Sequence, residues 1–215
     1  MRVTRPALCL AVAGSLLAGG VANAAVKKPV AKPVCNLITD VKGDGSTQVE
    51  GPVATSNDDR LDVLSADVAA GPKLITAVLR MAKADGTSPS PTGSHYDFLF
   101  NAPGATNQLY LEYFTGNPLL KAGFSYGYVD PTAGYTPLGK GDGVIDKAKN
   151  EVHITASLDG FDAKGAGPIK QKDKLSSLEV TTYSPDLIVL LPNADDAKSD
   201  RTYTVGQISC VTPGK

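Results

Sequence analysis

The chain has 215 residues, with 21 basic and 22 acidic side chains and a formal net charge of −1 at neutral pH. This nearly equal number of basic and acidic residues does not favour binding to nucleic acid, which requires a clustered basic surface. The 22 glycines and 15 prolines favour many short elements joined by turns, and the chain contains no tryptophan.

The first 24 residues have the pattern of a secretory signal peptide. Arg2 and Arg5 precede an apolar run over Pro6–Leu17, and Ala22–Ala24 supplies small residues for cleavage after Ala24. The apolar run is shorter than the roughly 20 residues that cross a bilayer, although an uncleaved anchor is the alternative. We therefore expect a secreted protein without a transmembrane segment in its mature chain. Loss of the two arginines leaves 19 basic and 22 acidic residues, a net charge of −3.

Residues 25–34 alternate lysine with proline and predict an extended, solvated basic tail. The remaining residues, 35–215, have a length typical of one all-β domain. Cys9 leaves with the signal peptide, so Cys35 and Cys210 remain. An even pair of cysteines in an oxidising compartment predicts a disulfide, with two independent thiols as the alternative. Such a bond would make the first and last strands neighbours.

Short apolar or alternating runs bounded by glycine and proline predict strands rather than helices. The expected strands are 35–39, 61–68, 73–81, 95–100, 108–114, 124–128, 143–146, 150–158, 175–183, 186–191 and 202–210. The expected loops are 46–57, 84–94, 130–143, 159–173 and 193–200. No segment has a convincing helical period. The pattern predicts an all-β antiparallel sandwich of about ten strands, or a jelly roll.

Strict alternation assigns side chains to the two faces of each predicted strand. In 61–68 it places Val63 and Val68 on opposite faces. The strand 73–81 is apolar on both faces, which indicates a central strand covered on each side. In 95–100, Tyr96, Phe98 and Phe100 share one face and are expected in the core or in cross-strand pairs.

The sequence contains few residue combinations that are typical of catalytic sites. The mature chain has two histidines, His95 and His153, and no Gly-x-Ser-x-Gly nucleophile elbow. Two distant histidines without a cysteine cluster make no zinc ligand set. An enzyme is therefore the less favoured interpretation.

Calcium is the one cation that the sequence favours, because it binds carboxylate and carbonyl oxygens from loops. Aspartates flank the first two predicted strands, and Asp195 and Asp196 form a third source further along the chain. The alternative is that these aspartates are solvated turn formers. The candidate ligands are Asp40, Asp44, Asp58, Asp59 and Asp62.

Tyrosines on a sheet face can stack against sugar rings, which suggests a carbohydrate-binding surface. The alternative is ordinary core packing. The candidate ligand-binding residues are Tyr110, Tyr126, Tyr128 and Tyr135.

Seven segments between the two cysteines carry a family resemblance. They are Asp40–Asp44 (Asp-x-x-Gly-Asp), Leu61–Val68, Leu74–Arg80, Phe124–Gly127, Asp146–Ile154, Leu178–Tyr183 and Arg201–Gly206. Together they resemble secreted bacterial sandwich domains of the DOMON-like, carbohydrate-binding type, which include modules appended to extracellular glucan-degrading enzymes and proteases. The resemblance implies a sandwich fold with an accessory role. Val41 and Lys42 stand where a proline-containing turn is common, and no haem or sugar ligand residue carries over.

These patterns predict a secreted, non-catalytic β-sandwich module. Its expected partner is a polysaccharide or a component of the cell envelope, and a structural calcium ion is the third possibility. The alternative function is a secreted hydrolase of the glycosidase kind that uses loop carboxylates near Asp58–Asp62.

Overall fold

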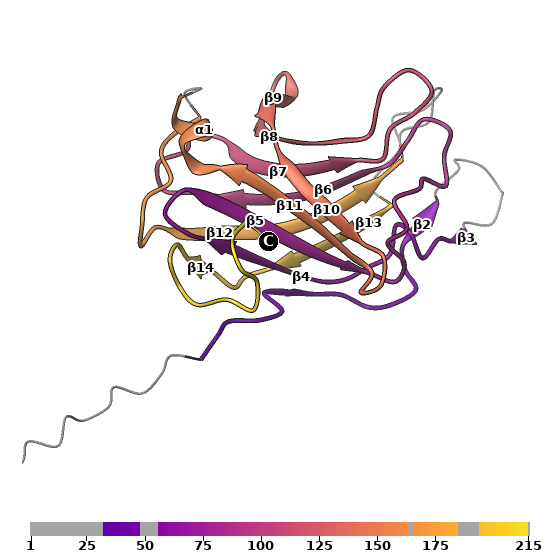
Figure 1. Ribbon diagram of the computed structural model, residues 1–215, viewed down its shortest axis with the longest axis horizontal. Coiled ribbons are helices and arrows are strands. Elements are labelled where there is room, and N and C mark those ends of the chain that lie inside the picture. Colours follow the sequence, from indigo (N-terminus) through magenta and orange to yellow (C-terminus); the bar gives the residue numbers. More distant parts are fainter. Residues whose placement is uncertain (1–31, 48–55, 164–165, 185–193, 215) are drawn as a thin grey trace, which may run out of the picture. The chain divides into compact units, whose positions relative to one another are not determined.

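Two antiparallel sheets lie over one another across a single apolar core in the computed structural model of the chain (Figure 1). The structure describes residues 32–47, 56–163, 166–184 and 194–214. The predicted all-β sandwich is confirmed. Among the described residues, no helix has the length and apolar character needed to span a membrane.

The smaller sheet has five strands in the order β1-β4-β5-β11-β10. These strands are β1 (Ile38–Thr39), β4 (Val63–Ala70), β5 (Leu74–Met81), β11 (Glu151–Ser157) and β10 (Asp142–Asp146).

The larger sheet runs β13-β12-β6-β7-β8-β9, and β14 also pairs with β12. Its strands are β13 (Asp195–Ser199), β12 (Lys174–Tyr183), β6 (His95–Asn101), β7 (Gln108–Phe114), β8 (Gly123–Asp130), β9 (Gly134–Lys140) and β14 (Tyr203–Thr204). A separate ribbon consists of β2 (Ser46–Thr47) and β3 (Ser56–Asn57), and one short helix is present, α1 (Leu158–Ala163).

Side chains that alternate along the strands fill the core as expected. Tyr96, Phe98 and Phe100 of β6 are all buried in it. Both faces of β5 are covered, because Leu79 joins the main core while Val78 packs with Val211 in a smaller cluster. The C-terminal segment therefore covers the outer side of the smaller sheet.

A β-bulge in β4 corrects the predicted assignment of faces. Val63 pairs with Met81 but Ser65 pairs with Arg80, so β4 holds one extra residue at this point. An inserted residue shifts the alternation by one position. Val63 and Val68 consequently both lie in the core instead of on opposite faces.

Several predicted loops contain regular structure. The range 130–143 includes β9 and the start of β10, and 193–200 includes β13. Strands β9 and β13 are the two edges of the larger sheet. Glycine, proline and charged residues are tolerated at edges because one side of an edge strand forms no ladder. The ribbon β2–β3 likewise lies within the predicted loop 46–57.

The remaining corrections concern a helix and the end of the chain. The predicted loop 159–173 begins inside α1, whose Phe161 is buried against Phe100 and Tyr126. The predicted strand 202–210 reduces to the two residues of β14. The predicted strand 186–191 lies outside the described residues.

The predicted disulfide between Cys35 and Cys210 is present, with the two Cα atoms 5.3 Å apart. Val34 and Ser209 form a parallel bridge beside it. The first and last strands themselves are not neighbours, since β1 pairs with β4 and β14 pairs with β12. The covalent bond therefore joins the segments that flank these strands.

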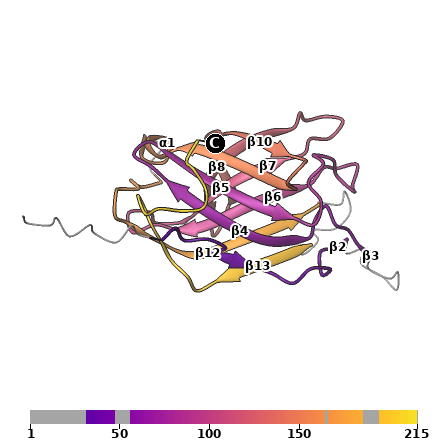
Figure 2. The ribbon, with the colours of Figure 1, turned by 60° about the horizontal axis from the view of Figure 1, so that its bottom comes forward.

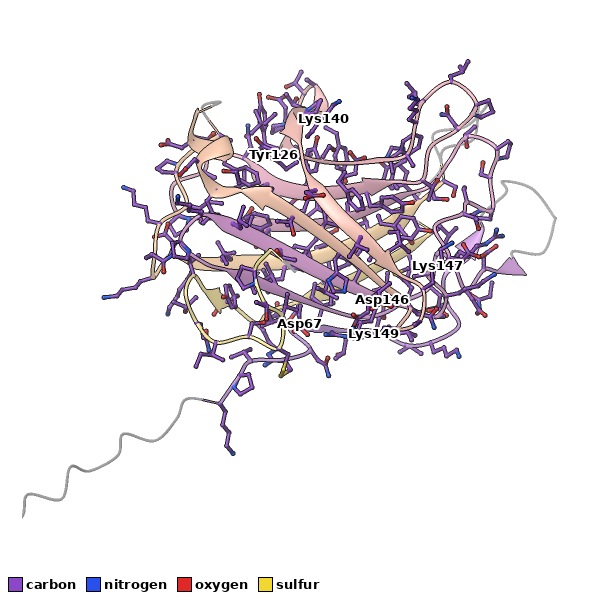
Figure 3. The ribbon with its side chains drawn as sticks, viewed as in Figure 1. Asp67, Tyr126, Lys140, Asp146, Lys147 and Lys149 are labelled. Carbon is purple, nitrogen blue, oxygen red and sulfur yellow. A yellow bond between two sulfur atoms is a disulfide. The ribbon has the colours of Figure 1, made fainter. Side chains whose placement is uncertain are left out.

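Charged side chains form a chain of contacts on the outer face of the smaller sheet, starting at Asp67 (Figure 3). Asp67 is fully buried, and its Oδ1 accepts a hydrogen bond from the Leu37 amide at 3.0 Å. Arg80 donates from Nη1 to Asp67 Oδ2 at 2.8 Å and from Nε to Glu151 at 3.1 Å. Glu151 in turn contacts His153 at 2.9 Å. The buried carboxylate is thus neutralised by one arginine.

Candidate functional site

Three aspartates meet where β1, β4 and β13 lie together at one edge of the sandwich (Figure 2). Asp40 follows β1, Asp44 lies in the turn before β2, and Asp195 begins β13. One carboxylate oxygen from each lies within 4.8 Å of the others. We call Asp40, Asp44 and Asp195 the carboxylate cluster.

Backbone contacts hold the carboxylate cluster in place. Asp195 accepts hydrogen bonds from the amides of Val63 at 2.7 Å and Asp196 at 2.8 Å. Asp40 donates its own amide to the Leu64 carbonyl at 3.0 Å. Because Asp195 belongs to one sheet and Val63 to the other, the cluster sits on a junction between the two layers.

A neighbouring acid, Asp62, is fully buried beside the turn that carries Asp44. Its Oδ2 accepts the Gly43 amide at 2.9 Å, and the positive φ of Gly43, 98°, suits a glycine in this turn. Asp62 Oδ1 and Asp40 Oδ2 are buried without a hydrogen-bond partner among the described residues. Buried polar atoms are normally satisfied, so the position of these two oxygens is energetically unfavourable.

The electrostatics of the carboxylate cluster disfavour charge. Burial, together with the charges of Asp40 and Asp44, raises the pKa of Asp195 to about 6. Burial and Asp44 also raise the pKa values of Asp40 and Asp62. Within the described part of the chain, no lysine or arginine forms an ion pair with the cluster.

The structure brings together only some of the predicted calcium ligands. Asp40 and Asp44 converge as expected, Asp195 joins them, and Asp62 lies beside their turn. Asp58 is instead held by Arg60, which donates to both carboxylate oxygens at 2.9 and 2.7 Å and lowers the pKa of Asp58. Asp59 is exposed and lies outside the cluster.

Asp196, the other member of the predicted third source, also lies outside the carboxylate cluster. Its carboxylate pairs with Lys198 at 3.1 Å, and its backbone register places it opposite Thr181. Of the two neighbouring acids, only Asp195 turns toward the cluster.

The four predicted ligand-binding tyrosines do not share one surface. Tyr126 is buried against Phe161 in the core, and Tyr128 packs against the same core (Figure 3). Tyr110 and Tyr135 form a second pair, with ring centroids 5.0 Å apart. Tyr110 is buried, whereas Tyr135 is 40% exposed. This second pair lies beside the acidic side chains of Asp97 and Glu112.

Sequence reasoning missed a polar group on the outer face of the larger sheet. Glu112 accepts a hydrogen bond from Ser125 Oγ at 2.5 Å and contacts His95 Nδ1 at 2.5 Å. Because the glutamate stands between them, Ser125 and His95 do not form the contact that a serine nucleophile needs. Alternation had placed these side chains opposite the apolar face, but their meeting depends on a strand register that the sequence does not reveal.

A hollow of about 410 Å³ lies on the outer face of β10 and β11. His153 and Thr155 line it, together with the exposed side chain of Val144. His153 contacts Glu151, and Thr155 Oγ1 is hydrogen-bonded to Thr76 Oγ1 at 2.8 Å. The groups in this hollow are engaged in structural contacts and form no nucleophile–base pair.

The chain matches no protein-family model, and comparisons with curated proteins and with solved structures found no match. The resemblance to DOMON-like domains therefore stays a prediction. Fold and site together define an antiparallel β-sandwich with a carboxylate cluster at one edge.

Proposed function

We propose that this chain is a non-catalytic β-sandwich domain that acts outside the cytoplasm and binds calcium at the carboxylate cluster. The observation that carries the proposal is the convergence of Asp40, Asp44 and Asp195 without a neutralising side chain among the described residues. In its wider role the domain binds a polysaccharide or another envelope component. Pull-down on cell-wall material and on polysaccharide arrays tests that role, and a uniform absence of binding would overturn it.

The ligand atoms favour calcium over other cations. The cluster offers carboxylate oxygens and no histidine or cysteine, which argues against zinc and copper. Calcium accepts oxygen ligands in irregular arrangements, whereas magnesium requires a near-ideal octahedron and keeps several waters. A cation among the three carboxylates would also remove their mutual repulsion.

An ion at this position would connect distant parts of the chain. Asp40 and Asp44 belong to the segment between β1 and β2, whereas Asp195 begins β13 on the other sheet. A ligand that binds only the folded state stabilises it by about 2.7 kcal/mol when its free concentration is about 100 times its Kd. The proposed calcium ion is therefore a structural clamp.

Calcium is expected to raise the melting temperature of the protein, and Asp44→Asn is expected to abolish most of that rise. Asp44 is exposed, and its side chain forms no hydrogen bond with the other described residues, so the variant should fold normally. Asp59→Asn is the matched control, because Asp59 is a nearby exposed aspartate outside the cluster. Differential scanning calorimetry with calcium and with chelator provides the measurement. An equal rise in Asp44→Asn, or no rise in the unmodified protein, would contradict the proposal.

The stabilisation by calcium is expected to increase with pH between about 4 and 6. Because the folded-state pKa of Asp195 is raised from 3.8 to about 6, the folded protein retains a proton that the unfolded chain loses in this window. Without calcium, stability should therefore fall as the pH rises, by roughly 2 kcal/mol from this group. Bound calcium keeps Asp195 ionised, so the stability of the calcium-bound protein should not fall in this way as the pH rises.

Unfolding curves at several pH values, each with and without calcium, test this dependence. The pKa of buried Asp97 is also raised, but its contribution is the same in both conditions and cancels in the difference. Groups with lowered pKa values, such as Asp58 and Asp85, lose their contribution only at lower pH. A calcium effect that is constant from pH 4 to pH 6 would exclude Asp195 as a ligand.

The alternative function, a hydrolase that uses carboxylates near Asp58–Asp62, has less support. Asp58 is held in a two-point contact with Arg60, and its lowered pKa disfavours a role as a general acid. Asp62 is fully buried, so it does not face a substrate directly.

A further inference from the structure

The outer face of the larger sheet buries a carboxyl group that makes no hydrogen bond of regular geometry among the described residues, although the Tyr135 side chain lies close enough to interact with it. Asp97 of β6 is fully buried, and neither of its carboxyl oxygens has a hydrogen-bond partner within the described ranges. Thr181 stands directly opposite on β12, and its buried hydroxyl likewise makes no hydrogen bond of regular geometry among the described residues. Each buried polar group without a hydrogen bond lowers the stability of the fold by about 1–3 kcal/mol. A ligand that interacts with these groups would remove part of this destabilisation.

A second acid faces the first. Asp97 pairs with Glu112 in the register of β6 and β7, and like charges in such a position are destabilising. His95 and Ser125 stabilise the charged form of Glu112 and lower its pKa despite burial. Burial and the charge on Glu112 raise the pKa of Asp97 well above its usual range. The surroundings of the pair therefore favour the ionised form of Glu112 and the neutral form of Asp97.

Aromatic rings enclose this pair of acids. The rings of Tyr110 and Tyr135 are 5.0 Å apart, those of Tyr135 and Tyr183 are 6.4 Å apart, and His95 stacks on Tyr183 at 4.5 Å. Tyr135 lies close enough to Asp97 for each to change the pKa of the other. We call Asp97, Glu112 and these four rings the outer-face cluster.

The cluster reaches the protein surface at two places. The side chains of His95 and Glu112 are 22% and 16% exposed, so the cluster reaches the surface there. Tyr135 is 40% exposed and belongs to the edge strand β9, which projects beyond the sheet at the top of Figure 1.

We propose that the outer-face cluster binds an organic ammonium group, with the nitrogen beside Asp97 and Glu112 and its alkyl groups against the tyrosine rings. Aromatic faces and carboxylates both attract a cation, and the contact with each ring is worth about 0.5–2 kcal/mol. The cluster contains no lysine or arginine, and its one basic side chain, His95, contacts Glu112 and leaves Asp97 without a cationic partner among the described residues. A neutral sugar would not reduce the electrostatic repulsion between Asp97 and Glu112. The site shares no residue with the carboxylate cluster.

Binding of an ammonium ion favours the ionised form of Asp97 and should therefore release about one proton per ligand. The other titratable groups of the cluster are Glu112, whose lowered pKa keeps it ionised, and Tyr110, Tyr135 and Tyr183, whose raised pKa values keep them neutral. His95 contacts Glu112 and can also exchange a proton, so the comparison with Asp97→Asn is what assigns the released proton to Asp97.

Isothermal titration calorimetry of the oxidised full chain in excess calcium tests the proposal. The probes are tetramethylammonium and butylammonium, with methyl glucoside as the neutral control, in buffers of different ionisation enthalpy. We expect either ammonium to bind with proton release and the glucoside not to bind. Asp97→Asn should weaken binding by about tenfold or more and abolish proton release. Asp159→Asn, at an exposed position in α1, should behave like the unmodified protein.

Absence of binding of both ammonium probes to the folded protein would overturn the proposal, as would unchanged binding in Asp97→Asn. If Asp97→Asn does not fold, Tyr135→Ala replaces it, because this partly exposed side chain is not needed to fill the core. Tyr135→Ala should also weaken binding by about tenfold. The same titration on Asp44→Asn separates the two sites: ammonium binding should persist there even though the calcium response is lost.

Discussion

Replacement of both Cys35 and Cys210 by serine is expected to lower the free energy of unfolding by about 5 kcal/mol. The disulfide closes a loop between cysteines 175 residues apart, and the loss of chain entropy in the unfolded state grows with loop length. A change of this size is a large part of the stability of an ordinary domain. Urea unfolding of the oxidised protein and the double variant gives the comparison.

A reductant supplies the control for this prediction. Reduction of the unmodified protein should lower its urea midpoint to that of the double variant, and the double variant itself should not respond. Equal midpoints for the oxidised protein and the double variant would show that the unfolded chain is already restricted in other ways.

Arg80→Met is expected to destabilise the fold by about 3–5 kcal/mol, because it leaves a buried charge without a partner. Asp67 is fully buried and loses the contact at 2.8 Å from Arg80 Nη1. Adding Asp67→Asn should recover part of the loss, since the asparagine oxygen can still accept the Leu37 amide. The double-mutant cycle from urea unfolding measures this coupling.

Lys149→Met is the matched control for the arginine. Lys149 pairs with Asp146 at 3.0 Å in the exposed turn after β10, where both residues lie at the surface (Figure 3). Solvent-exposed ion pairs contribute little, so this variant should unfold at nearly the same urea concentration as the unmodified protein. A similar loss in Lys149→Met and Arg80→Met would mean that burial of Asp67 is not the cause.

The core of the sandwich could be predicted from the sequence because its signal is local. The alternation of Tyr96, Phe98 and Phe100 needs no information from other strands. The bulge at Val63–Ser65 could not be predicted, since it arises from pairing with β5. The edge strands β9 and β13 were mistaken for loops because an edge strand tolerates glycine, proline and charge.

The candidate sites were predictable only in part, because the contacts between strands that assemble them leave no signal in the sequence of one strand. The acidic turn of Asp40 and Asp44 is visible in the sequence, but its contact with Asp195 depends on the packing of β1 against β13. Asp58 and Arg60 form an ion pair only two positions apart in the sequence. The sequence still did not predict this pair, because either side chain could have turned elsewhere. The opposition of Asp97 and Glu112 follows from a register that no single strand encodes.

The disulfide has a mechanical consequence. The Cα atoms of Cys35 and Cys210 are 5.3 Å apart, so a single covalent bond closes the loop that contains the strands of both sheets. A pulling force applied at the two cysteines passes through the sulfur atoms, and the strands between them carry no tension. After reduction the same force would act on the bridge between Val34 and Ser209 first and then on the strands.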